Sequence, residues 1–276
     1  MVKFAKLHGA GNDFVAIDGV EDETWDYSEL AEKACHRRFG VGADGLLVVK
    51  PSEKAECFML YYNADGSRAN MCGNGLRCFV KFVRDSGIVK TDRFQVETFA
   101  GVFDVEASTE GGKVKSVKVK MGGAVLAPEM IPVDYEGDRF IQQKIAVSGR
   151  TVEVSSILVG VPHTMVFVDD IDMEEVLTLG PEIEKHPVFP EGTNVNFVKA
   201  VDRENLVVYT WERGCGHTLA CGTGICASAY VSNLIGICGE SVSVESPGGR
   251  IYIEIKDGII YMDGPAVKIC EGILEV

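Results

Sequence analysis

Positive charge is scarce in this sequence, in which 27 lysine and arginine residues stand against 41 aspartate and glutamate residues and the formal net charge is −14. Nucleic acids and anionic membrane surfaces attract basic proteins, so this charge argues against both as partners. Unbroken apolar runs are only a few residues long, far short of the roughly 20 residues that cross a bilayer. An anionic substrate would therefore need locally placed hydrogen-bond donors.

The chain also lacks the features of a secreted or zinc-binding protein. Its nine cysteines are an odd number, and the opening residues 1–8 contain no apolar signal core. We therefore expect reduced thiols and a cytoplasmic location. The cysteine spacings 72–78 and 215–221 are C-x₅-C, and 221–226 is a single C-x₄-C with no second pair of that kind elsewhere, so we expect no metal site.

Two short stretches of the chain share one design. Cys72 is followed by Gly73-Asn74-Gly75 and Cys221 by Gly222-Thr223-Gly224, and each stretch leads into an apolar run at helical spacing. A thiol at a helix start lies beside unpaired backbone N–H groups and the positive end of the helix dipole. Such surroundings lower a cysteine pKa from about 8.5 toward 3.5–7.5. The pattern predicts two thiols that exchange protons at neutral pH.

The two stretches belong to a longer internal repeat. Cys72 lies 149 positions before Cys221, Asn63 lies 149 before Glu212, and Val96 lies 148 before Val244. A nearly constant offset predicts two pseudo-symmetric α+β domains, each a mixed or antiparallel sheet around a central helix that starts at its cysteine. We expect the domains to span 1–121 and 122–264, with 265–276 packing back on the first, and the active site to lie in the cleft between them.

Local patterns place the individual elements. Helices are expected from Thr24 or Asp26 to about His36, over 74–84, over 172–184 and from Cys221 to about Leu234. Strands fill most of the remaining chain, and Gly160-Val-Pro-His163 is expected to form a loop before a strand over 165–168.

Two facing thiols suit the inversion of a carbon that bears a proton. One thiolate takes the proton from one face while the other thiol delivers a proton to the opposite face. No lysine lies in or beside the glycine loops, which argues against pyridoxal phosphate, and we expect no cofactor. Backbone N–H groups of Gly73-Asn74 and Gly222-Thr223 would have to stabilise the carbanion and hold its carboxylate.

These residues resemble the diaminopimelate epimerase family over nearly the whole chain. The matching motifs are Lys6-x-His8-Gly9-x-Gly11-Asn12-Asp13-Phe14, Gly42-x-Asp44-Gly45, Asn63-x-Asp65-Gly66-Ser67-x₄-Cys72-Gly73-Asn74-Gly75-x-Arg77, Pro162-His163, Gly192-x-Asn194-Val195, Glu212-Arg213-Gly214, Ala220-Cys221-Gly222-Thr223-Gly224 and Gly264-Pro265-Ala266. A motif set of this length is far more specific than a single glycine-rich loop.

The resemblance implies a cofactor-independent enzyme that interconverts LL- and meso-diaminopimelate for lysine and peptidoglycan synthesis, often as a homodimer. It implies that Cys72 and Cys221 are the acid–base pair, flanked by His163 and Glu212. The residues implied to hold substrate are Asn12, Asn63, Gly73, Asn74, Asn194, Glu212, Arg213, Gly222 and Thr223.

Two departures from the family pattern keep an alternative open. Val161 replaces the asparagine that usually precedes Pro-His, and His217 replaces a common glutamate, with Cys215 close by. These changes are compatible with racemisation of another polar amino acid, for example histidine. A different class of function is a catalytically silent protein that holds an anion at its helix starts. The paired thiols argue against it, because anion capture needs no cysteine.

Overall fold

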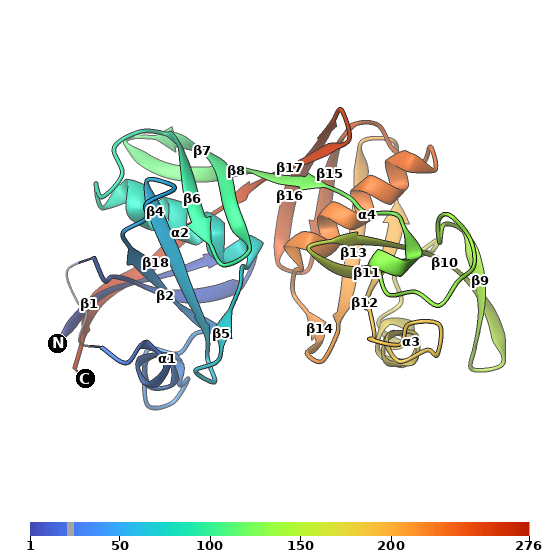
Figure 1. Ribbon diagram of the computed structural model, residues 1–276, viewed down its shortest axis with the longest axis horizontal. Coiled ribbons are helices and arrows are strands. Elements are labelled where there is room, and N and C mark those ends of the chain that lie inside the picture. Colours follow the sequence, from blue (N-terminus) through green and yellow to red (C-terminus); the bar gives the residue numbers. More distant parts are fainter. Residues whose placement is uncertain (21–24, 276) are drawn as a thin grey trace. The chain divides into compact units, whose positions relative to one another are not determined.

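The computed structural model describes residues 1–20 and 25–275 (Figure 1). The chain divides into two compact units. One comprises Met1–Lys120 together with Asp263–Val276, and the other comprises Met121–Met262.

The first unit is built on a mixed sheet. Its strands follow the spatial order β18, β1, β2, β3, β4, β6, β7, β8; only the pairs β2–β3 and β4–β6 are parallel, and the short β5 pairs with β4. The bounds are β1 Val2–Gly9, β2 Asn12–Asp18, β3 Gly45–Lys50, β4 Cys57–Asn63, β5 Arg68–Ala69, β6 Arg93–Thr98, β7 Gly101–Glu110, β8 Lys113–Gly123 and β18 Val267–Leu274.

The second unit repeats this arrangement. Its order is β9, β10, β11, β12, β13, β15, β16, with β11–β12 and β13–β15 parallel and β14 paired with β13. The bounds are β9 Gln143–Val147, β10 Arg150–Val159, β11 Val161–Phe167, β12 Asn194–Ala200, β13 Asn205–Glu212, β14 Gly216–Thr218, β15 Ser241–Ser246, β16 Gly249–Lys256 and β17 Ile259–Pro265. The expected α+β fold of two similar halves is confirmed.

Strand registers match between the units residue by residue. Phe14 pairs with Gly45 across β2 and β3, and His163 pairs with Asn194 across β11 and β12. Both members of the second pair are 149 positions after those of the first. The helices α2 (Gly73–Asp85) and α4 (Gly222–Leu234) have the same offset and the same length of 13 residues. The repeat therefore extends to individual side-chain positions.

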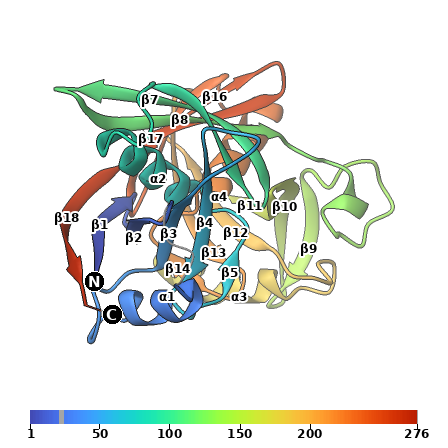
Figure 2. The same ribbon diagram turned by 60° about the vertical axis from the view of Figure 1, so that its left-hand side comes forward.

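Each sheet carries helices on both faces, as Figures 1 and 2 show for α1 and α2 of the first unit. α1 (Tyr27–Cys35) packs over Val15 and Leu46, whereas the start of α2 lies over Phe14 and Leu47. Side chains alternate along a strand, so these two pairs point to opposite faces. Asp26 caps α1 by accepting from the backbone N–H groups of Ser28 and Glu29; Thr24, the other expected cap, lies outside the described residues.

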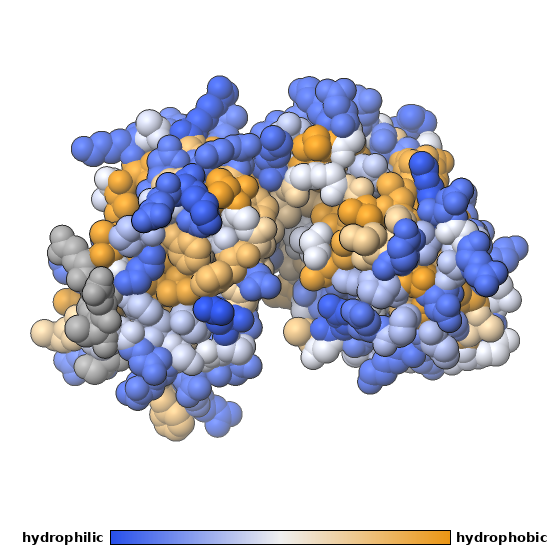
Figure 3. Space-filling model, in the orientation of Figure 1, coloured by the Kyte–Doolittle hydropathy of each residue, from blue (hydrophilic) through white to orange (hydrophobic). Residues whose placement is uncertain are grey.

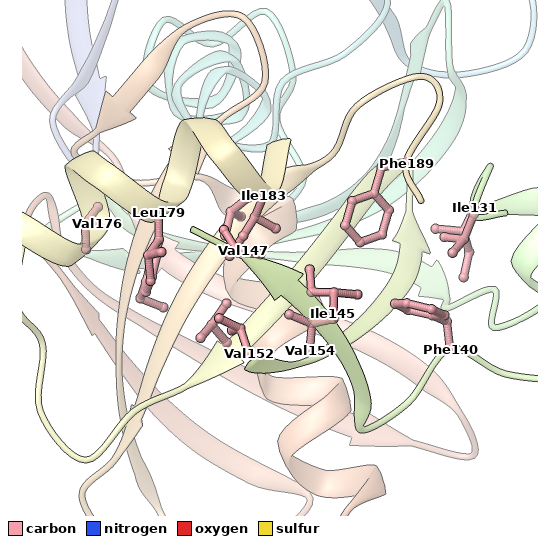
Figure 4. Packing of buried hydrophobic residues seen from close by; sticks show 14 residues of the cluster. Ile131, Phe140, Ile145, Val147, Val152, Val154, Val176, Leu179, Ile183 and Phe189 are labelled. Atoms are coloured by element: carbon pink, nitrogen blue, oxygen red, sulfur yellow. The ribbon is translucent and has the colours of Figure 1, made fainter. Parts of the chain in front are cut away.

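In the second unit α3 (Met173–Glu184) covers the face of the sheet opposite α4. Its inward residues Val176, Leu179 and Ile183 pack with Ile145 and Val147 of β9 in one buried apolar cluster (Figure 4). Asp172 caps this helix by accepting from the backbone N–H of Glu174. This apolar cluster therefore lies on the α3 side, whereas the α4 side combines buried apolar residues such as Met165 and Val198 with the polar His163 and Asn196.

The expected loop over Gly160–His163 is wrong. Gly160 alone turns the chain with a φ of +71°, so that Val159 pairs with Val161 and β11 starts at once. Pro162 and His163 are therefore strand residues, although a proline argues against a strand interior. Strands β9 and β18 were not expected either, because their alternation of apolar and polar residues is weak.

Hydrophilic side chains predominate on the face shown in Figure 3, with apolar patches between them, in keeping with the net charge of −14. Among the described residues no helix is long and apolar enough to cross a membrane.

Candidate active site

Cys72 is the N-cap of α2, as the sequence predicts. Its Sγ accepts from the backbone N–H of Gly75 at 3.4 Å and lies 3.5 Å from Asn12 Oδ1. The thiol is half-buried. It therefore lies among the first N–H groups of a helix, where a negative sulfur is stabilised.

Asn12 is oriented by a charged network. Its Nδ2 donates to Asp44 Oδ2 at 2.6 Å, and Arg37 NH2 donates to Asp44 Oδ1 at 2.6 Å and to Asp13 Oδ1 at 2.9 Å. Burial raises the pKa of Asp13, but its hydrogen bonds and ion pairs with Arg37 and Lys6 outweigh burial and lower that pKa below its usual value. Because Asp44 only accepts, the Asn12 carbonyl oxygen is turned toward Cys72.

The other predicted residues of this unit lie at the end of β4 and in the first turn of α2. Asn63 ends β4, pairs with Gly45 and donates through Nδ2 to Ser67 Oγ at 3.0 Å. Gly73 and Asn74 form the first turn of α2, and Asn74 is buried with its Oδ1 2.7 Å from the NH2 group of Arg77. Asn12, Asn63 and Asn74 are thus positioned by β2, β4 and α2 of the same unit.

Cys221 is the N-cap of α4 in the second unit. Its Sγ is 3.5 Å from Thr223 Oγ1, and Glu212 at the end of β13 hydrogen-bonds to the same thiol. Burial raises the pKa of Glu212, while hydrogen bonds from Thr218 and Cys221 work in the opposite direction. The Thr218 hydroxyl donates to Glu212 Oε1 at 2.5 Å. Cys221 therefore lies between a carboxyl group that accepts a hydrogen bond from the thiol and a hydroxyl group that can donate one to it.

His163 points to the same helix start from β11. Its Nε2 is 2.9 Å from Thr223 Oγ1, and its Nδ1 is 3.3 Å from Asn196 Nδ2. Burial, with a smaller contribution from the charge of Arg213, lowers the pKa of His163 to about 3. The imidazole is therefore neutral at physiological pH.

Asn194 and Arg213 are held together beside this cluster. Asn194 Oδ1 accepts from the backbone N–H of Arg213 at 3.0 Å, and Asn194 Nδ2 donates to the Pro162 carbonyl at 2.7 Å. The Arg213 guanidinium donates to the carbonyl of Glu191 at 2.8 Å. A guanidinium held in this way can bind a carboxylate with two parallel hydrogen bonds.

Sequence reasoning missed several residues that position this site. Glu184, at the end of α3, accepts from Trp211 Nε1 at 2.6 Å and from the backbone N–H of Gly214 at 3.0 Å, which fixes the loop of Arg213. Asp44, Thr218 and Asn196 likewise hold a predicted site residue by a hydrogen bond, and these residues are Asn12, Glu212 and His163, respectively. A charged or amide residue inside an otherwise apolar strand is the only signal in the sequence that could have indicated Asn196.

A model of the family described as diaminopimelate epimerase matches residues 4–127 and 155–269. The chain belongs to the diaminopimelate epimerase family. The enzymes of this family are isomerases, so the chain is an isomerase of this type.

Two curated relatives named diaminopimelate epimerase match the chain over its whole length. One, from Alkaliphilus metalliredigens, is 48% identical over 275 residues, covering 99% of this chain and 97% of the relative. The other, from Caldanaerobacter subterraneus subsp. tengcongensis, is 50% identical over 276 residues and both chains are covered completely.

Solved structures of similar fold extend beyond this family. A probable proline racemase from Agrobacterium radiobacter has a TM-score of 0.74 at 16% identity, covering 100% of this chain and 93% of its own. A hydroxyproline epimerase from Agrobacterium vitis has a TM-score of 0.72 at 17% identity, covering 98% of this chain and 91% of its own. At such identities the likeness concerns the fold alone.

Proposed function

We propose that this protein interconverts LL- and meso-diaminopimelate in lysine and peptidoglycan-precursor synthesis, in the cytoplasm and without a cofactor. The observation that carries the proposal is the matched placement of Cys72 and Cys221, each the N-cap of the equivalent helix in a repeated unit. Full-length relatives named for this activity support the choice of substrate.

The two thiols act on opposite faces of the α-carbon. One of them, as thiolate, removes the α-proton, and the other, as thiol, delivers its proton to the opposite face. The thiol–thiolate pair is then reversed, so the same groups catalyse the return reaction. Two such groups are needed because the proton leaves one face of the carbon and another arrives at the opposite face.

The neighbours of Cys221 support proton exchange at that sulfur. Glu212, whose pKa burial raises, shares a hydrogen bond with the thiol, and Thr223 lies on its other side. We assign Glu212 and His163 to the reacting centre on this basis. Beside Cys72 lies the side-chain amide of Asn12, which cannot exchange a proton.

Backbone donors stabilise the carbanion. Gly73-Asn74 and Gly222-Thr223 provide N–H groups at two helix starts, where the helix dipole favours an anion. Removal of one such donor in other enzymes lowers the rate roughly 10²–10³-fold. We assign these four residues to the reacting carboxylate.

The remaining predicted residues hold the far end of the substrate. Arg213, oriented by Asn194, suits a second carboxylate, and Asn12 and Asn63 supply amides for an ammonium group and a carboxylate. A binding site for a second α-amino acid group favours diaminopimelate, which has two such groups, over a substrate with only one, such as histidine.

Hydrogen exchange tests the substrate directly. The wild-type chain is incubated in D₂O with LL- and meso-diaminopimelate and with a panel of other amino acids, histidine and proline among them, and α-deuterium is measured by mass spectrometry. We expect rapid exchange with both diaminopimelate isomers and little with the others. Faster exchange with another amino acid would overturn the substrate, and binding without any exchange would favour a silent anion-binding protein.

We also propose a homodimer, which the family resemblance implies. Val267, Ile269 and Ile273 of β18 expose 43%, 53% and 60% of their surfaces. A second copy would bury these apolar side chains. Sedimentation of the wild type and of an Ile269→Lys, Ile273→Lys variant tests the proposal. We expect a dimer and a monomer, respectively; a monomeric wild type would contradict it.

A further inference from the structure

A buried polar cluster lies beneath the first turn of α4. It consists of His163, Asn196 and Thr210, which expose 0%, 0% and 3% of their surfaces. Burial of polar side chains is unfavourable unless they are hydrogen-bonded, and even then it adds little to stability compared with apolar packing. The fold alone therefore gives little reason to retain three polar side chains here.

The first unit shows that the fold does not need them. The residues 149 positions earlier are Phe14, Leu47 and Tyr61, which lie beneath the start of α2. They are buried, and the rings of Phe14 and Tyr61 pack edge to face with centroids 5.9 Å apart. The same backbone is thus stabilised by apolar packing in one repeat and by a hydrogen-bonded cluster in the other.

The hydrogen bonds of Asn196 fix the direction of its amide. Asn196 Nδ2 donates to the backbone carbonyl of Thr164 at 3.4 Å, and Asn196 Oδ1 accepts from Thr210 Oγ1 at 3.0 Å. A reversed amide would place two carbonyl oxygens against each other. The group that faces His163 Nδ1 at 3.3 Å is therefore an N–H donor.

A ring nitrogen that accepts a hydrogen bond carries no proton, so in the neutral ring the proton is on Nε2. His163 Nε2 then donates to Thr223 Oγ1 at 2.9 Å. Because the Cys221 thiol donates its hydrogen to Glu212, the Thr223 hydroxyl is the donor in the contact of 3.5 Å between Thr223 Oγ1 and Cys221 Sγ. The chain of donors runs in one direction, from Asn196 to the thiol.

We propose that Asn196 is a positioning residue that holds His163 in the tautomer with the proton on Nε2, directed at Thr223 and Cys221. The inference rests on the proposed function, because that function assigns His163 and Cys221 to the reacting centre. It adds that the two thiols have different surroundings: Cys221 receives a hydrogen bond from this relay, whereas Phe14, Leu47 and Tyr61 occupy the matching positions in the first unit.

The tautomer can be observed without any assay of activity. The ¹⁵N chemical shifts of the His163 ring distinguish a protonated nitrogen from an unprotonated one, and a His163→Gln sample identifies its signals among the five histidines. We expect the wild-type ring to carry its proton on Nε2. A wild-type spectrum with the proton on Nδ1 would overturn the proposal.

Two variants reverse or remove the constraint. Asn196→Asp presents a carboxylate that accepts from Nδ1, so the proton should move to Nδ1. Asn196→Leu introduces the residue that the first unit uses at the equivalent position, Leu47, and should leave a mixture of tautomers. Spectra identical to that of the wild type in both variants would overturn the proposal.

Kinetics separate positioning from a merely structural role. Asn196 is fully buried, so its variants should lower kcat with little change of KM. We expect a loss of about 10- to 100-fold, part of the roughly 10²–10⁴ that general acid–base catalysis contributes. Thr210→Val should lower kcat in the same way and Thr210→Ser should preserve it, which keeps the test open if an Asn196 variant does not fold.

The outcomes distinguish this inference from the proposed function. A wild type that exchanges no α-proton but shows the Nε2 tautomer would refute the function and leave the positioning of His163 intact. An active enzyme whose Asn196→Leu variant keeps both the wild-type kcat and the wild-type tautomer would refute the inference alone.

Discussion

Asp44 accepts a hydrogen bond of 2.6 Å from the side-chain amide of Asn12, and this bond turns the amide oxygen of Asn12 toward Cys72 at 3.5 Å. A carboxylate has no hydrogen to donate, so it fixes which end of the amide faces the thiol. Arg37 holds the same carboxylate through its other oxygen at 2.6 Å. The surroundings of Cys72 therefore depend on a residue that does not touch the thiol.

Replacement of this carboxylate should impair catalysis. Asp44→Asn removes the charge and allows the Asn12 amide to turn, so we expect kcat/KM to fall about 10- to 100-fold, the worth of a hydrogen bond to a charged group. Asp104→Asn, an exposed carboxylate bonded to Gln95, is the matched control and should keep the wild-type value. An equal loss in both variants would show that net charge, not orientation, is responsible.

The pH dependence of activity should follow Glu212. Thr218 donates to this carboxylate and thereby opposes the rise of its pKa caused by burial. Thr218→Val removes the donor, so the pKa of Glu212 should rise further and the acidic limb of the kcat/KM profile should move to higher pH. Thr218→Ser retains the donor and should follow the wild-type profile. A valine variant whose profile superimposes on the wild type would exclude Glu212 as the titrating base.

Glu184 should affect substrate binding through the loop of Arg213. Glu184→Ala leaves the partly buried donors of Trp211 and Gly214 without their acceptor, so the loop of Arg213 loses two anchoring hydrogen bonds. We expect a higher KM for diaminopimelate with kcat mostly kept, as loss of uniform binding produces. Glu184→Gln keeps an acceptor oxygen and should show a smaller change. A lower kcat at constant KM would contradict this role.

Two equivalent glycines offer a comparison within one chain. A Cβ on Gly75 would meet Leu47, Phe14 and Cys72 at ordinary distances of 3.4 Å, whereas a Cβ on Gly224 would overlap Asn196 Oδ1. Alanine is favoured over glycine in a helix by up to about 1 kcal/mol.

Gly75→Ala should therefore be neutral or stabilising in urea unfolding, and Gly224→Ala should be clearly destabilising. Equal unfolding midpoints for the two variants would mean that the polar cluster beneath α4 accommodates the added methyl group without loss of stability.

Much of the fold could be predicted from the sequence, because its strongest signals are local. Asp26 and Asp172 marked the starts of α1 and α3, and the repeated cysteines marked those of α2 and α4. Strand β11 was missed because Pro162 favours a loop, while the register with β10 is set by the single turn residue Gly160. Strand β18 was missed because its alternation of apolar and polar residues is weak, and because its partner β1 lies at the other end of the chain.

The candidate site could be predicted only for residues that carry chemistry themselves. Cys72, Cys221, Glu212 and Arg213 stand out by type and repetition. Asn196 and Thr210 do not, because their role depends on which strand face they share with His163, and that face is known only from the register of β11, β12 and β13. Residues that act by positioning others in this way can be identified only from the three-dimensional structure.

Inversion measured separately in Cys72→Ala and Cys221→Ala tests the central claim most directly. Each variant is given LL- and meso-diaminopimelate in turn, and the stereochemistry of the product is followed by chiral chromatography beside the wild type. The two-thiol mechanism predicts that the wild type inverts both isomers and that neither variant forms inverted product from either. Inversion at a substantial rate by either variant would show that one of these thiols is dispensable and would contradict the account.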